Sequence, residues 1–103
     1  ILSGRVMILK GPTNIIVSSM GDIYFMDHGT SMLATAGSGD VLTGILSSSL
    51  AQGANINDAA IYSTYMHAEC ARQYANKINS NGLIASDLIE MIPYAMKNLN
   101  DIY

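Results

Sequence analysis

The chain has little charge, no tryptophan and one cysteine. Only 13% of its 103 residues are charged, and the formal net charge is −3. The five lysines and arginines are scattered singly, which argues against binding to nucleic acid or to an anionic membrane surface. The apolar runs are too short for a membrane span, and no stretch resembles a signal peptide. These features predict neither a nucleic-acid partner nor a membrane partner.

The single cysteine, Cys70, cannot form an internal disulfide, so we expect a reducing compartment such as the cytoplasm. One cysteine and two histidines at unrelated spacing cannot supply the four ligands of a structural zinc site. No other metal-binding cluster is predicted. Half of the residues are hydrophobic, which is typical of one globular domain rather than a disordered segment.

Apolar runs near the start of the chain predict three strands. Residues 5–10 form a nearly continuous apolar run that fits a buried strand, paired in parallel if helices cover both faces of its sheet. Residues 14–18 and 23–26 are typical of a hairpin with a turn at residues 19–22. Three strands are too few to complete an α/β sheet, so we expect further strands from residues N-terminal to Ile1 or from another chain. We therefore expect self-association of this chain, as a homo-oligomer.

Three helices are expected after the strands. One covers residues 39–51, and a second begins with Asn57 as its cap and ends near Asn79. A third begins with Ser86 as its cap, and Pro93 is expected to break it and start a final segment. The expected buried face of the second helix is made of small and semi-polar residues: Ala60, Thr64, His67, Ala71 and Tyr74. We interpret His67 as packed or hydrogen-bonded rather than catalytic, and Cys70 as a buried hydrophobe.

The segment Gly37-Ser38-Gly39-Asp40 precedes the apolar face of the first of these helices. Glycines at a helix N-terminus let the backbone approach an anion, where N–H groups and the positive end of the helix dipole face outward. A carboxylate beside such a site repels a phosphate, unless it takes a proton from the group that attacks the phosphate. Asp40 is therefore a candidate base; the alternative is that it only complements the helix dipole.

This segment resembles the Gly-x-Gly-Asp anion-hole motif of the ribokinase-like superfamily. The longer string from Leu33 to Ile45, with Ala51-Gln52-Gly53 after it, is similar to the NAD(P)H-hydrate dehydratases of that superfamily. The resemblance implies a three-layer α/β/α fold, of which residues 1–103 would be the C-terminal part of a single domain. The N-terminal part of that domain would then be absent from this sequence.

The same resemblance implies which residues bind ligands. Asp40 would be the catalytic base and contact the substrate, and Mg²⁺ would accompany the nucleotide. The implied nucleotide-binding residues are Lys10, Gly11, Pro12, Thr13, Asn14, Thr30, Thr35, Ala36, Gly37, Ser38 and Gly39. The co-substrate would be ADP or ATP, and the residues do not settle which.

The implied reaction repairs hydrated nicotinamide cofactors, NADHX or NADPHX. A nucleotide phosphate is transferred to the ring hydroxyl, and elimination of phosphate regenerates NADH or NADPH. One alternative is a kinase of the same superfamily that phosphorylates a vitamin precursor or a sugar. A second alternative is a non-catalytic fragment that only binds nucleotide or assembles with other chains.

Overall fold

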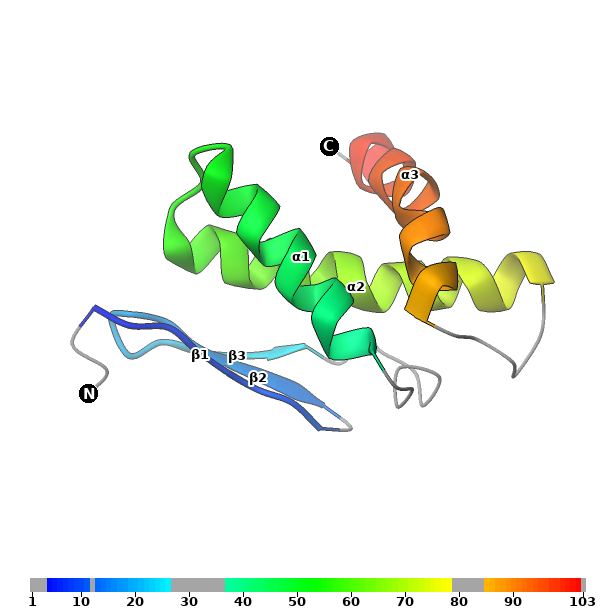
Figure 1. The fold of residues 1–103 in the computed structure, drawn as a ribbon. Helices are drawn as coiled ribbons and strands as arrows, with labels where there is room; N and C mark the ends of the chain where they lie inside the picture. Colours follow the sequence, from blue (N-terminus) through cyan, green and yellow to red (C-terminus); the bar gives the residue numbers. More distant parts are fainter. Residues whose placement is uncertain (1–3, 12, 27–36, 79–84, 103) are drawn as a thin grey trace.

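A small antiparallel sheet is followed by three long helices in the part of the chain that the computed structural model describes, residues 4–11, 13–26, 37–78 and 85–102 (Figure 1). The strands are β1 (Met7–Leu9), β2 (Asn14–Val17) and β3 (Ile23–Met26). The helices are α1 (Ser38–Ala51), α2 (Ile56–Ile78) and α3 (Ala85–Ile102). The predicted order of three strands and then three helices is confirmed.

The three strands pair in the order β1-β2-β3, and both pairings are antiparallel. Ile16 in β2 lies opposite Ile8 of β1 and Tyr24 of β3. Among the described residues, β1 has an antiparallel partner on one edge, and a parallel partner on its other edge stays a prediction. The connection between β1 and β2 is too short for a parallel crossover, which needs a dozen or more residues.

The two faces of the sheet have different environments. Successive side chains alternate between the faces, and α2 contacts β2 on the face where Ile16 is only 1% exposed. On the other face, Leu9 and Phe25 are 47% and 71% exposed, and no described element covers them. The expectation that β1 is buried is thus wrong for this part of the chain.

The start of α2 differs from the prediction. The helix begins at Ile56, and its cap is Asn55 rather than Asn57. The side-chain oxygen of Asn55 accepts the Asp58 backbone N–H at 2.9 Å, and its amide donates to the Asp58 carboxylate at 2.8 Å. This reciprocal pair stabilises the helix N-terminus.

Asn57 instead joins α2 to the β2–β3 turn. Its side-chain oxygen accepts the Ser19 backbone N–H, and its amide donates to Ser19 Oγ, both at 2.9 Å. The turn itself is closed by the Ser18 N–H, which donates to the Asp22 carbonyl at 2.8 Å. The pair of bonds from Asn57 fixes the sheet against the helical layer.

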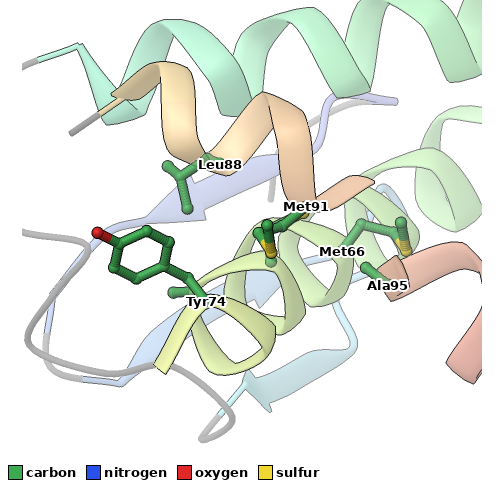
Figure 2. Close-up of a cluster of buried hydrophobic side chains, with 7 residues drawn as sticks. Met66, Tyr74, Leu88, Met91 and Ala95 are labelled. Carbon is green, nitrogen blue, oxygen red and sulfur yellow. The ribbon is translucent and has the colours of Figure 1, made fainter. Parts of the chain in front are cut away.

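The main core lies between the helices. Figure 2 shows Met66 and Tyr74 of α2 facing Leu88, Met91 and Ala95 of α3, and all five side chains are buried. Apolar residues of α1 pack against this cluster as well. The predicted buried face of α2 is confirmed, since all its residues are at most 6% exposed: Ala60, Thr64, His67, Ala71 and Tyr74.

Helix α3 runs continuously through Pro93. The prediction that Pro93 starts a new segment is wrong, as is the prediction of Ser86 as the cap, because the helix already includes Ala85. A proline inside a helix removes one N–H donor and its ring clashes with the carbonyl four residues earlier, and a helix that continues through it accommodates this by bending. The helix packs along α2, and Lys77 lies 4.2 Å from the ring centroid of Tyr94 across this interface.

The one fully buried carboxylate among the described residues of α2 is compensated locally. The Glu69 carboxylate, which is fully buried, accepts two hydrogen bonds from Arg72 and one from Gln73. Burial, and then the charge of Glu69, raises the pKa of the Cys70 thiol to about 12. The thiol therefore stays protonated, which confirms Cys70 as an unreactive buried side chain.

None of the helices in the described ranges is long and apolar enough to cross a membrane.

Candidate phosphate site at the start of helix α1

The glycine turn lies at the N-terminus of α1, as predicted. Gly37 adopts a left-handed conformation, with φ of 84°, and its carbonyl accepts the N–H groups of Asp40 and Val41 at 3.1 and 3.3 Å. A side chain here would be strained, and its β-carbon would lie 3.2 Å from the Ala85 β-carbon of α3. Glycine at this position thus lets the turn form close against α3.

Lys10 reaches the same turn from the sheet. It follows the last residue of β1, and a β-carbon added at Gly39 would lie only 2.6 Å from Lys10 Nζ. The end of β1 lies near the start of α1 (Figure 1). The structure therefore brings together an ammonium group and a glycine-rich helix N-terminus that are separated by about thirty positions in the sequence. Both features attract phosphate.

His67 contacts the turn from the protein interior. Its Nε2 lies 2.8 Å from the Ser38 carbonyl oxygen, and since a carbonyl only accepts, Nε2 carries the proton. Burial is the main effect that lowers the pKa of His67 below its ordinary value of 6.5. The hydrogen bond to Ser38 partly offsets this, and the positive charge of Lys10 lowers the pKa further. His67 is therefore neutral at physiological pH, and the prediction of a hydrogen-bonded histidine is confirmed.

Asp40 is exposed in the first turn of α1. It stands at the edge of a cavity of about 920 Å³ that is formed by all three helices and lined largely by apolar side chains, including Ile45, Tyr62 and Ile92. Lys10 and the glycines of the turn do not line this cavity. The cavity and the glycine turn are thus separate features that meet at Asp40.

The segment after β1 forms a tight turn. The side-chain oxygen of Asn14 accepts the Gly11 backbone N–H at 3.3 Å, and Thr13 is half-buried. The predicted ligand contacts of these residues remain predictions. Four residues of the predicted site lie outside the described ranges: Pro12, Thr30, Thr35 and Ala36.

Sequence reasoning missed two of these relationships. It did not predict the contact of His67 with the turn, although the residue lies on the predicted buried face of α2. It also assigned the α2 cap to Asn57, whereas the spacing of Asn55 to Asp58 is the usual signal for a reciprocal cap. The partner of Asn57 is 38 residues away, and no local pattern indicates it.

The sequence matches a known protein family. The sequence profile of the NAD(P)H-hydrate dehydratase family matches residues 3–94. This chain belongs to that family. It is 35% identical over 96 residues to the bifunctional NAD(P)H-hydrate repair enzyme Nnr of Moorella thermoacetica, covering 93% of this chain and 18% of that protein. It is 43% identical over 68 residues to the ADP-dependent (S)-NAD(P)H-hydrate dehydratase of Neisseria meningitidis. That alignment covers 66% of this chain and 23% of the Neisseria protein.

The fold is also that of a NAD(P)H-hydrate dehydratase. The structure aligns with the ADP/ATP-dependent NAD(P)H-hydrate dehydratase of Bacillus subtilis, co-crystallised with ATP and Mg²⁺, with a TM-score of 0.83 and 30% identity. The alignment covers 90% of this chain and 34% of that one. The chain thus spans between about a fifth and a third of the length of the relatives it matches, and its α/β elements form part of the dehydratase fold.

Proposed function

We propose that this chain forms the phosphate-binding side of an ADP- or ATP-dependent NAD(P)H-hydrate dehydratase. The observation that carries the proposal is the contact of the Lys10 ammonium group with Gly39 at the N-terminus of α1. A helix N-terminus alone is a common feature, but here a cation from a different element stands beside it. Their combination matches what a nucleotide phosphate requires.

In this proposal the turn and Lys10 hold the phosphates. Backbone N–H groups near Gly39 and the dipole of α1 stabilise negative charge on the transferred phosphoryl group. Lys10 adds a full positive charge from the end of β1. The absence of a side chain at position 39 lets this charge approach the backbone closely.

Asp40 is the proposed base. Its carboxylate takes the proton of the substrate hydroxyl as the hydroxyl oxygen bonds to phosphorus, and the bond between that phosphorus and the nucleotide breaks. The phosphorylated ring then loses phosphate from one carbon and a proton from the neighbouring carbon, which forms the ring double bond of NADH or NADPH. The exposure of Asp40 leaves its carboxylate accessible to a substrate.

Mg²⁺ needs no dedicated protein cage in such a site. Across the described ranges, no group of three or more His, Cys, Asp or Glu side chains is arranged to hold a metal ion. Mg²⁺ commonly keeps several of its waters and binds through the phosphates of the nucleotide rather than through a cage of protein side chains. The ion would neutralise charge on the phosphates of the bound nucleotide.

The acceptor pocket is proposed to lie largely outside this chain. The matched relatives extend well beyond the aligned region, since the chain covers 34% of the Bacillus subtilis enzyme. We infer that residues 1–103 are the C-terminal part of one dehydratase domain. The rest of that domain would supply contacts to the hydrated nicotinamide ring.

The proposal is tested by binding and turnover in the complete protein. We expect Mg·ADP or Mg·ATP to bind, and hydrated NADH to be converted to NADH in its presence. Lys10→Met should weaken nucleotide binding by about tenfold or more, since a charge-assisted contact is lost. Lys97→Met removes an exposed lysine of α3 and should leave binding unchanged.

Two results would contradict the proposal. One is a complete protein that binds neither nucleotide. The other is nucleotide binding with phosphorylation of a sugar or vitamin precursor and no turnover of hydrated NADH, which would indicate the small-molecule kinase instead.

A further inference from the structure

A buried hydrogen bond joins α2 to the proposed phosphate site. His67 and Ser38 are 3% and 5% exposed, and Nε2 of His67 donates to the Ser38 carbonyl at 2.8 Å. Water has little access to either residue, so it competes weakly for this bond. The bond fixes one point of the glycine turn to the rigid interior.

The Ser38 carbonyl belongs to the same peptide group as the Gly39 N–H. A peptide group is planar, and this one is trans, so its carbonyl and its N–H point in opposite directions. Restraining the carbonyl toward His67 therefore directs the Gly39 N–H away from His67. In a helix, this direction is toward the N-terminal end, where an anion binds.

The Gly39 N–H belongs to the first turn of α1, where N–H groups have no acceptor within their own helix. The N–H groups of Asp40 and Val41 already donate to the Gly37 carbonyl. Within the described ranges, the Gly39 N–H has no protein acceptor. It lies beside the Lys10 ammonium group, which contacts the same residue.

Ser38 lies between two glycines at the start of α1, so the His67 hydrogen bond adds a restraint to the one that the helix itself supplies. Glycine has a wide range of backbone conformations, so the Ser38–Gly39 peptide can rotate more easily than most. We propose that His67 is a positioning residue: its hydrogen bond to the Ser38 carbonyl holds the peptide group that presents the Gly39 N–H to the nucleotide phosphate. This inference rests on the proposed function.

The state of His67 agrees with this role. Burial and the nearby charge of Lys10 both lower its pKa, so the ring stays neutral, with its one proton on Nε2. A neutral ring donates the required bond without adding a charge to the core. The alternative is that the bond only stabilises packing between α1 and α2.

The test compares two substitutions of His67 in the complete protein, whose side chains have similar lengths. Gln at position 67 keeps an amide donor near the place of Nε2, whereas Met has a similar shape and no donor. We expect His67→Met to weaken Mg·ADP binding by about tenfold, the equivalent of one hydrogen bond. His67→Gln should stay within about twofold of the wild type, because it restores that bond.

Two further measurements separate positioning from packing. Adenosine has no phosphate, so its affinity should be equal in the wild type and in His67→Met. Cys70→Ala, on the same helix, should lower the melting temperature through a core cavity and leave Mg·ADP affinity unchanged. If His67→Met does not fold, His67→Asn replaces it, since its shorter amide does not reach the carbonyl.

Several outcomes would overturn the inference. One is unchanged Mg·ADP affinity in His67→Met. Another is an equal loss of Mg·ADP affinity in His67→Gln and His67→Met. A third is a loss of adenosine affinity in His67→Met as large as its loss of Mg·ADP affinity. Failure of the wild-type protein to bind either ADP or ATP is a different result. It would remove the proposed function itself, and this inference with it.

Discussion

The Lys10 ammonium group occupies the space in which a side chain at Gly39 would begin, 2.6 Å from the position of a β-carbon. A side chain at position 39 would therefore have to displace the end of the Lys10 side chain. This contact places a positive charge against the backbone of the glycine turn, and the first prediction follows from it.

Alanine at position 39 should displace Lys10 and weaken Mg·ADP binding by about tenfold, since a charge-assisted contact is disturbed. Gly44 provides a matched control in the same helix, because a β-carbon there would have no described atom within 4 Å. Gly44→Ala should keep nucleotide affinity and raise the free energy of unfolding by about 0.5–1 kcal/mol. Calorimetric titration and urea unfolding of both variants check the prediction. Equal affinities in the two variants would contradict it.

The link between Asn57 and Ser19 should be measurable as a coupling energy. The two side chains form a hydrogen bond, and a second bond runs from the Ser19 N–H to Asn57. Asn57→Ala should destabilise the protein by about 1–3 kcal/mol, since it leaves part-buried groups of the turn without partners. In a double-mutant cycle with Ser19→Ala, we expect a coupling of at least about 0.5 kcal/mol. Strictly additive effects would show that the sheet is not held in this way.

Local patterns in the sequence predicted the elements well. The β-branched residues of β2, the turn before β3 and the apolar face of α2 each depend on neighbours in the chain, so their patterns are readable. The glycine turn at the start of α1 was predicted for the same reason. The family resemblance added the expectation that Lys10 belongs to the same site.

Relationships between distant residues were harder to predict. The exposure of Phe25 depends on what covers the sheet, and the partner of Asn57 depends on how α2 packs against the β2–β3 turn. The contact between His67 and Ser38 joins two helices and involves a backbone carbonyl. Every residue has such a carbonyl, so the amino-acid sequence does not indicate which one a histidine will contact. Pro93 shows the reverse problem, because packing along α2 keeps α3 helical despite a strong local signal to end it.

His67 should make stability depend on pH. Its pKa is lowered in the folded protein, so below pH 6.5 the unfolded chain binds a proton on this ring that the native state does not. The free energy of unfolding should therefore be unaffected by His67 above about pH 6.5 and should decrease as the pH falls below it. His67→Gln should remove this contribution. Urea unfolding from pH 5 to 7 checks the difference between the two proteins, and identical pH profiles would contradict a neutral, buried His67.

The central claim is that Asp40 acts as a base beside a phosphate site. Asp40→Asn should keep or raise Mg·ADP affinity, because a negative charge near the phosphates is removed. Asp58→Asn is a matched control in the first turn of α2. It should affect stability and leave turnover unchanged.

The most direct measurement is the turnover of hydrated NADH by the complete protein carrying Asp40→Asn, with its nucleotide affinity and melting temperature determined in parallel. We predict a fall in turnover of about 10²- to 10⁴-fold, with nucleotide affinity retained. A near-normal rate, with stability lowered by about 0.3–1 kcal/mol, would contradict the account and leave Asp40 as a residue that only complements the dipole of α1.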